Sequence, residues 1–352
     1  MSATVDRIAP LQGLRAIASI AIAFAHFHNQ FLQVGNDNTM GFLAIGVDVF
    51  FVTSGFIMLH IAWGDFGSAA ASWEFLRRRL ARIVPLYWAC TTVFLIYILD
   101  TQTLEQVGTN WQHYFASLAF IPIRATPFLG VGWTLNFEMF FYVCFAACLL
   151  LPRAAGLACL AIGFVAFVII QNRFAFGPPV QYWASAMIFE FLAGVGLAVL
   201  YRYVRPPAWL LVTLLIVTSG IAYLSYSDPM FGIPKFNGAL RPLIWGAASV
   251  SAVACAIFIR LPMPRWLSLM GDASYAIYLI HPLMLYAALE FIGRMYAFHG
   301  INVPNRNWPF ALGLLGLTIG LSIVIHLAAE RPLMRWLNSL GREPRLIPKP
   351  AS

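Results

Sequence analysis

The sequence predicts an all-α protein, a polytopic bundle of about ten transmembrane helices. Two compositional features of the 352-residue chain support this prediction: 61% of its residues are hydrophobic and only 10% are charged. A soluble domain has about 25% charged residues, so this chain has too few to cover a water-facing surface. The third feature is a series of apolar runs, each long enough to cross a hydrocarbon core of about 30 Å.

The apolar runs follow one another along almost the whole chain. They fall near residues 10–31, 41–62, 80–99, 131–151, 155–171, 183–201, 208–226, 240–259, 270–291 and 309–330. Proline and glycine punctuate the connections between them. No polar stretch approaches the roughly 100 residues of a soluble catalytic domain. We therefore expect one membrane domain over residues 1–340 and a short, disordered cytoplasmic tail over residues 341–352.

The basic residues predict the orientation of the helices. The formal net charge of +8 could suggest nucleic acid, but the basic residues form short clusters between apolar runs, as the positive-inside rule describes. With a cytoplasmic N-terminus, the inner side receives Arg7, Arg77, Arg78, Arg79, Arg82, Arg153, Arg202, Arg205, Arg260, Arg265, Arg331, Arg335, Arg342, Arg345 and Lys349. The outer side receives only Arg124, Arg173, Lys235, Arg241, Arg294 and Arg306. Both termini are therefore predicted to be cytoplasmic.

The cysteines give no indication of a metal or disulfide framework. All five lie in apolar runs without metal-ligand spacing: Cys90, Cys144, Cys148, Cys159 and Cys255. Cysteine in such a setting behaves as a small buried hydrophobic residue. We expect that role for all five and expect no metal.

Arg15 and His26 lie eleven residues apart in the first apolar run. Eleven residues at about 100° each return a helix to within roughly 20° of the starting face, and they span about 16 Å along the axis. One helix face therefore carries a cation suited to phosphate and an imidazole suited to proton transfer, near opposite ends of a membrane span. Ionisable groups inside a bilayer are costly, so each is first a hypothesis of function.

Three carboxylates are predicted to lie at the depth of His26, in the outer half of the membrane. They are Asp48, Glu138 and Glu190, in the second, fourth and sixth runs. If the helices pack around a common cavity, these groups converge on the imidazole. A carboxylate beside a histidine fixes its tautomer and stabilises the imidazolium, as a general base requires.

The cytoplasmic side carries the opposite charge. The segment RRRLAR at residues 77–82 places several guanidinium groups at the start of the third run, and Arg79 and Arg82 share a helix face. Guanidinium groups match phosphate oxygens well. A phosphate-bearing donor that enters from the cytoplasm would meet this cluster while its far end reaches toward His26.

Each polar group also has a structural explanation. The arginine cluster could anchor the topology or contact lipid headgroups, His26 could be a packing residue, and Asp48 and Glu138 could pair with buried arginine or backbone groups. Ser54-Gly55 favours close helix packing over a nucleophile. His28 and Asn29 are expected to be solvated, and the aromatic residues favour an interface belt over a sugar site: Trp111, Trp183 and Trp308. The joint pattern of polar groups at both ends of one path favours function.

Several motifs together resemble the acyltransferase-3 family of membrane acyltransferases, which includes exopolysaccharide-production and lipopolysaccharide O-acetyltransferase members. They occur in the family's order between Leu11 and Leu333. The matching pieces are Arg15 with His26, GVDVFFVTSGF (46–56), RRLARIVPLYW (78–88), WTLNFEMFFY (133–142), GDASYAIYLIHP (271–282) and ERP (330–332). Thr53 stands where isoleucine or leucine is more usual, which should be tolerated. The chain shows no hydrolase-like carboxy-terminal domain, so acceptor handling is expected within the membrane part.

The resemblance implies a ten-helix enzyme that takes an acyl group, usually acetyl from acetyl-CoA, from the cytoplasm. It would pass this group to a hydroxyl of an exopolysaccharide, lipopolysaccharide or lipid-linked sugar, in a bacterial inner membrane. The family's essential Arg-x10-His pair falls on Arg15 and His26, its Arg-x-x-Arg on Arg79 and Arg82, and its Trp-Ser/Thr-Leu-x-x-Glu element on Glu138.

The resulting hypothesis gives these residues two roles. Arg15, Arg79 and Arg82 bind the phosphates of acyl-CoA. His26 acts as a general base or a transient acyl carrier, and Asp48 or Glu138 orients it. The main alternative is a transporter or flippase of a polysaccharide or lipid-linked intermediate, which intramembrane charge and ten spans suit equally well. The lack of an internal repeat disfavours it. A third possibility is a noncatalytic subunit of a polysaccharide-synthesis complex.

Overall fold

The computed structural model describes residues 8–32, 40–101, 104, 110–123, 126–227, 240–259, 261–299 and 307–340. Within these residues all regular secondary structure is helical, as predicted. In the described part of the chain, nine helical stretches are long and apolar enough to cross a membrane. Large apolar side chains stay exposed along them, such as Ile162 and Ile216 at 68% and 67%. Lipid, rather than water, is the solvent that suits such a surface.

The long helices carry most of the fold. They are α1 (Ala9–Phe31), α2 (Ile45–Ala62), α3 (Ala69–Thr101), α5 (Trp133–Leu149), α6 (Arg153–Phe174), α9 (Ala208–Ser227), α10 (Leu240–Phe258), α12 (Ser274–His299) and α13 (Trp308–Ile325). Shorter elements connect or extend them: η1 (Gly41–Ala44), α4 (Trp111–Leu118), η2 (Gly130–Gly132), α7 (Val180–Trp183), α8 (Ile188–Tyr203), α11 (Arg265–Asp272), η3 (His326–Glu330) and α14 (Arg331–Leu340).

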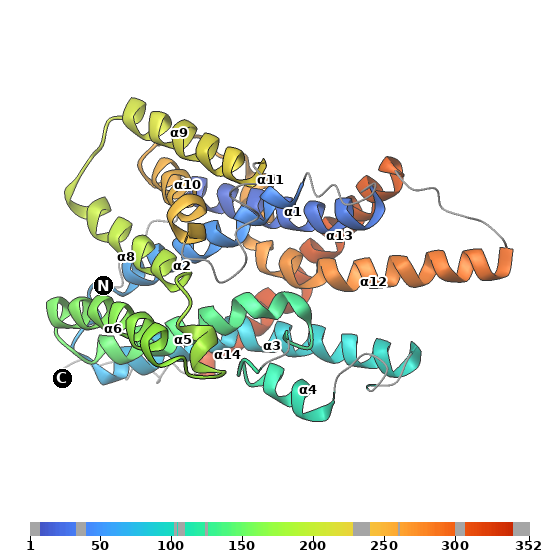
Figure 1. Cartoon of the computed structure of the whole chain (residues 1–352), viewed down its shortest axis with the longest axis horizontal. Coiled ribbons are helices and arrows are strands. Elements are labelled where there is room, and N and C mark those ends of the chain that lie inside the picture. The colour runs from blue at the N-terminus through green and yellow to red at the C-terminus, as the bar shows by residue number, and fades with distance from the viewer. Residues whose placement is uncertain are drawn as a thin grey trace, which may run out of the picture.

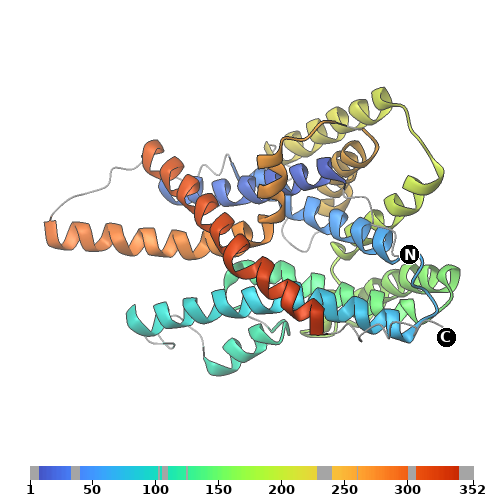
Figure 2. The same cartoon turned by 180° about the vertical axis from the view of Figure 1, so that it is seen from behind.

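The helices form two groups with a common direction (Figure 1). One group contains α1, α2, α8, α9 and α10, and the other contains α3, α4, α5 and α6. Helix α12 packs against both α1 and α3. Figure 2 shows α13, η3 and α14 crossing the back of the molecule, so that α13 contacts α1 while α14 contacts α3. The interior between the two groups is where α1, α2, α3, α5 and α12 meet.

The predicted span near residues 183–201 differs from the others. It corresponds to α8, whose 16 residues fall short of the about 20 that a bilayer core requires. The chain before it forms only the single turn of α7 after Pro178 and Pro179. The chain then forms turns at residues 184–187, so the helical part starts later than the hydrophobicity suggests. Helix α8 is packed between α2 and α10.

Two glycines let α2 and α8 approach closely. A Cβ atom on Gly55 would lie 2.8 Å from the backbone carbonyl carbon of Phe191, and one on Gly194 would lie 2.8 Å from the backbone nitrogen of Phe56. Small residues permit this approach between membrane helices, where packing drives association. The close packing expected at Ser54-Gly55 is therefore present at Gly55.

A π-helical turn interrupts the last long helix. In η3 the His326 Nδ1 lies 2.8 Å from the Glu330 Oε2, and both side chains are nearly buried. The pair satisfies two ionisable groups inside the helix bundle, and Glu330 is the first residue of the ERP segment that contributed to the family resemblance.

Some sequence expectations need correction or lie outside the described residues. Cys90 and Cys148 are buried as expected, but Cys159 is exposed on α6. His28, expected to be solvated, is 6% exposed because its ring packs against Phe24 and Trp308. The basic residues outside the described part are Arg7, Arg124, Lys235, Arg260, Arg306, Arg342, Arg345 and Lys349, and the tail over 341–352 lies there too.

Candidate active site

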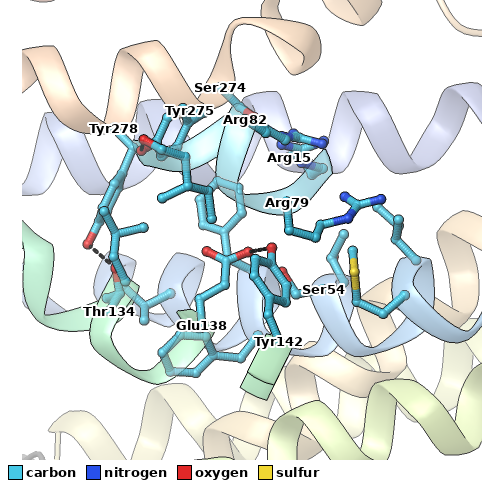
Figure 3. A pocket seen from close by; sticks show the side chains of 18 residues that line it. Arg15, Ser54, Arg79, Arg82, Thr134, Glu138, Tyr142, Ser274, Tyr275 and Tyr278 are labelled. Atoms are coloured by element: carbon cyan, nitrogen blue, oxygen red, sulfur yellow. Dashed lines mark hydrogen bonds between the residues drawn. The ribbon is translucent and has the colours of Figure 1, made fainter. Parts of the chain in front are cut away.

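A cavity in the bundle interior brings together the three arginines predicted to bind phosphate. Arg15 comes from α1, and Arg79 and Arg82 come from α3. Helices α2, α5 and α12 complete the lining with polar and aromatic side chains, among them Ser54, Thr134, Glu138, Tyr142, Ser274, Tyr275 and Tyr278. Figure 3 shows the guanidinium groups gathered at one side of the cavity and Glu138 with Tyr142 at another. Helices that are distant in sequence thus line one charged cavity.

No carboxylate of the described residues lies within ion-pair distance of these three guanidinium groups. Arg15 is 7% exposed, and its closest polar partner is the Gln12 Oε1, 3.3 Å from Nη1. The guanidinium of Arg79 lies over the Phe75 ring at 5.7 Å, and its Nε has no hydrogen-bond partner among the described residues. Three cations and one carboxylate, Glu138, leave the cavity with excess positive charge, which favours an anionic ligand.

Glu138 belongs to this cavity. Its Oε1 accepts hydrogen bonds from the Ser54 hydroxyl at 2.9 Å and from the Tyr142 hydroxyl. Across the cavity, the hydroxyls of Thr134 and Tyr278 lie 2.9 Å apart. The prediction that Glu138 converges on His26 is therefore wrong. The carboxylate contacts α2 and its own helix and faces the arginines.

The other arginines of the cluster are engaged elsewhere. Arg77 binds the Glu74 carboxylate at 2.7 Å and donates to the Leu337 carbonyl of α14 at 2.7 Å. Arg78 is exposed and also pairs with Glu74, at 2.5 Å. The structural role that the sequence left open for this cluster thus applies to Arg77 and Arg78. Arg79 and Arg82 of the same helix line the cavity.

His26 lies on α1, away from this cavity, and pairs with a second histidine. Its Nδ1 is 2.7 Å from the Nε2 of His281 on α12. His281 is fully buried, whereas His26 is exposed. The expectation that Asp48 or Glu138 orients the His26 ring is not met, because the hydrogen-bonding partner of the ring is an imidazole.

Asp48 and Glu190 form a separate buried cluster where α2, α8 and α10 meet. The Asp48 carboxylate binds the Arg241 guanidinium through two contacts, Oδ2–Nη2 at 2.7 Å and Oδ1–Nε at 3.1 Å. Glu190 is 2% exposed and lies beside Gly246, whose added Cβ would be 3.3 Å from the Glu190 Cγ. The predicted convergence of three carboxylates on His26 therefore does not occur. Glu138 binds Ser54 of α2, Asp48 binds Arg241 of α10, and neither oxygen of Glu190 has a hydrogen-bond partner among the described residues.

Sequence reasoning missed two kinds of site residue. His281 was present in the GDASYAIYLIHP segment but received no role, because nothing in the sequence pairs it with His26. Ser54 and Tyr142 bind Glu138, and the i,i+4 spacing of Tyr142 and Glu138 on one helix could have indicated that contact. Their convergence with the arginines depends on helix packing and has no local signal.

The fold and these polar groups define the class of protein: a multi-pass helical membrane protein with a buried cationic cavity and a histidine pair that joins α1 to α12. Comparison with known proteins gives the family. The family model described as "Acyltransferase domain" matches residues 8–327. The chain therefore belongs to the acyltransferase-3 family, as its motifs indicated, and it is a membrane acyltransferase.

Curated relatives agree with this assignment. The chain is 34% identical to the exopolysaccharide production protein ExoZ of Rhizobium meliloti, over 86% of this chain and 92% of the relative. It is 27% identical to the acyltransferase MdmB of Streptomyces mycarofaciens, over 100% and 98% of the two chains. It is 25% identical to the peptidoglycan O-acetyltransferase OatA of Listeria monocytogenes, over 55% of this chain and 34% of that protein. No solved structure matches the chain significantly.

Proposed function

We propose that this acyltransferase moves an acetyl group from cytoplasmic acetyl-CoA to a hydroxyl of an exopolysaccharide, lipopolysaccharide or lipid-linked sugar, in the bacterial inner membrane. The observation that carries the proposal is the cavity lined by Arg15, Arg79 and Arg82, in which no described carboxylate forms an ion pair with these guanidinium groups. Such a chamber favours a multiply charged anion, and the phosphates of a coenzyme A thioester supply one.

The arginines are proposed to bind the acyl donor. Arg79 and Arg82 lie near the start of α3, in the region that the positive-inside rule assigns to the cytoplasmic side, and Arg15 lies in the first half of α1. A donor held here by its phosphates would enter from the compartment that contains acyl-CoA. Arg77 and Arg78 face away from the cavity and contribute to the fold through Glu74.

His26 is proposed to carry out acyl transfer. It lies on the same helix as Arg15, about 16 Å further along the axis, and its ring is exposed. A donor whose phosphates bind Arg15 could therefore extend its thioester arm along α1 toward the imidazole. A hydroxyl is a poor nucleophile unless a base takes its proton during attack, which contributes about 10²–10⁴-fold. A transient acyl-histidine is the other route open to the same side chain.

Glu138 is the third proposed participant. Its carboxylate shares the cavity with the arginines, and two hydroxyl donors hold one of its oxygens. We assign Glu138 to the cavity that binds the donor, where it limits the positive charge and positions the bound thioester. Glu138 is not proposed to orient His26, since Glu138 lines the cavity and His26 does not.

The acceptor class follows from the relatives. ExoZ is named for exopolysaccharide production and OatA for O-acetylation of peptidoglycan, so a sugar hydroxyl is the acceptor that suits this chain. Mass spectrometry of surface glycans from cells with and without the protein would identify the modified sugar and the mass of the transferred group. A mass increase that corresponds to a succinyl group instead of an acetyl group would indicate that the donor is succinyl-CoA and not acetyl-CoA.

The proposal is tested with purified protein in liposomes that contain lipid-linked saccharides extracted from the host membrane. Acetyl-CoA labelled in the acetyl group is added, and both label transfer and release of free coenzyme A are measured. We expect stoichiometric transfer by the wild type, none by His26→Ala and full transfer by the control His28→Gln on the same helix. Full activity of a well-expressed His26→Ala variant would refute the role of His26. Saccharide movement without thioester consumption would indicate a carrier instead.

A further inference from the structure

The environment of His281 restricts where its proton can be. The ring is fully buried on α12, and its Nδ1 lies 3.3 Å from the backbone carbonyl oxygen of Ile277. The neighbouring carbonyl of Tyr278 lacks its helical donor because Pro282, four residues later, has no N–H. A carbonyl oxygen only accepts hydrogen bonds, so the Nδ1 of His281 must carry the proton.

This assignment determines the state of His26. A neutral imidazole protonated at Nδ1 has a lone pair at Nε2. The Nε2 of His281 is 2.7 Å from the Nδ1 of His26, so the shared hydrogen bond requires a proton on the Nδ1 of His26. In a neutral His26 ring, the Nε2 is then the nitrogen with a free lone pair.

We infer that His281 is a positioning residue that holds His26 in the Nδ1–H tautomer and presents its Nε2 as the base or acyl-accepting nitrogen. This inference rests on the proposed role of His26. It assigns to an imidazole the function that a carboxylate has in many histidine sites. Among the described residues, neither ring forms a hydrogen bond or ion pair with a carboxylate, and the nearest rings around His281 are those of Phe27, Tyr278 and His26.

Both possible routes of acyl transfer need this tautomer. In direct transfer, the acceptor oxygen bonds to the thioester carbon, the C–S bond breaks, and the hydroxyl proton moves to the His26 Nε2 and then to the thiolate. In the carrier route, Nε2 bonds to the carbon as the C–S bond breaks. The acyl group then moves to the acceptor oxygen, and the hydroxyl proton ends on the thiolate. A proton already on Nε2 would block the first step of either route.

The tautomer itself can be observed, independently of activity. Protein with ¹⁵N-labelled histidine is placed in lipid bilayers, and the two ring nitrogens of His26 are assigned by comparison with His26→Ala. We expect a protonated Nδ1 and a bare Nε2 in the wild type. In His281→Met, which keeps a side chain but removes the strong acceptor, the proton should move to Nε2, the form that free neutral imidazole side chains prefer. A protonated Nε2 in the wild type overturns the inference, even if His281→Met fails to fold.

Activity gives a second readout. His281→Met should lower kcat by about 10²-fold, the lower end of what a positioned base contributes, while the KM for acetyl-CoA stays unchanged because the arginine cavity is untouched. His281→Gln places a carbonyl acceptor near the former Nε2 and should regain much of kcat. An equal loss in both variants, or a rise in KM with kcat unchanged, contradicts a positioning role. His28→Gln is the matched control.

The two measurements separate this inference from the proposed function. If His26→Ala is fully active, the proposed role of His26 fails, whatever the tautomer. If His26→Ala is inactive but the wild-type ring carries its proton on Nε2, the role of His26 stands and only the role of His281 fails.

Discussion

Asp48 and Arg241 bind each other through both carboxylate oxygens, and their side chains are 0% and 3% exposed. The pair joins α2 to α10, 193 residues apart in sequence. Two guanidinium nitrogens already bind the carboxylate, so its charge is balanced inside the bundle. Asp48 therefore has the structural role, pairing with a buried arginine, that the sequence left open beside a catalytic one.

Removing Asp48 should destabilise the protein. Asp48→Ala removes the carboxylate that binds the buried Arg241 guanidinium through two contacts, and breaking a buried ion pair typically costs about 3–5 kcal/mol. Thermal unfolding in detergent should show a clearly lower midpoint. The double variant Asp48→Leu with Arg241→Met removes both charges of the pair and should recover part of the lost stability, because apolar replacement of a whole buried pair is often neutral while the buried Glu190 stays in the cluster. A stable double variant without transferase activity would instead show that Asp48 acts in the reaction.

Substitution of the cavity arginines should weaken donor binding. Arg79→Gln or Arg82→Gln should each raise the KM for acetyl-CoA by about 10- to 100-fold, because a hydrogen bond to a charged group contributes about 1.5–3 kcal/mol. Steady-state kinetics in liposomes measure this effect. Arg78→Gln is the control from the same cluster, since Arg78 is exposed and paired with Glu74. A similar rise in KM for the control would show that general surface charge, and not the cavity, attracts the donor.

Glu138→Gln separates donor binding from chemistry. The amide keeps the shape and can accept from Ser54 and Tyr142, but the cavity loses its negative charge. We expect the KM for acetyl-CoA to stay equal or fall, since the cavity becomes more cationic, and kcat to fall by about 10²-fold, the loss that a misplaced reacting group typically causes. An increased KM with unchanged kcat would contradict this assignment.

The close approach of α2 and α8 makes a matched pair of glycine variants informative. Gly194→Ala places a methyl group against the backbone of α2, whereas Gly196→Ala, two residues later, meets nothing within 4 Å. Overpacking costs about 1–3 kcal/mol, and alanine at the open position should be neutral or stabilising because its helix propensity exceeds that of glycine. Thermal unfolding should separate the two variants. Equal midpoints would mean that α8 does not pack on α2 in this way.

The sequence by itself determined the class of fold and the residues worth testing. Hydrophobic runs of membrane length are local features, so most of their boundaries were predictable to within a few residues, but α3 begins at Ala69 instead of near residue 80 and α12 extends to His299 instead of near residue 291. Helix α8 also starts later than predicted, because the chain forms turns at residues 184–187 before it. The eleven-residue spacing of Arg15 and His26 is also local, since helix geometry alone puts both side chains on one face of α1.

Only the tertiary structure decided which polar groups meet. Depth in the membrane suggested that Asp48, Glu138 and His26 converge, but depth does not specify the rotation or the neighbours of a helix. Packing placed Glu138 with the arginines of α1 and α3, paired Asp48 with Arg241, and brought His281 to His26 across 255 residues. The physical reason is that a side chain's depth follows from its position along one helix, whereas a contact depends on how two helices pack.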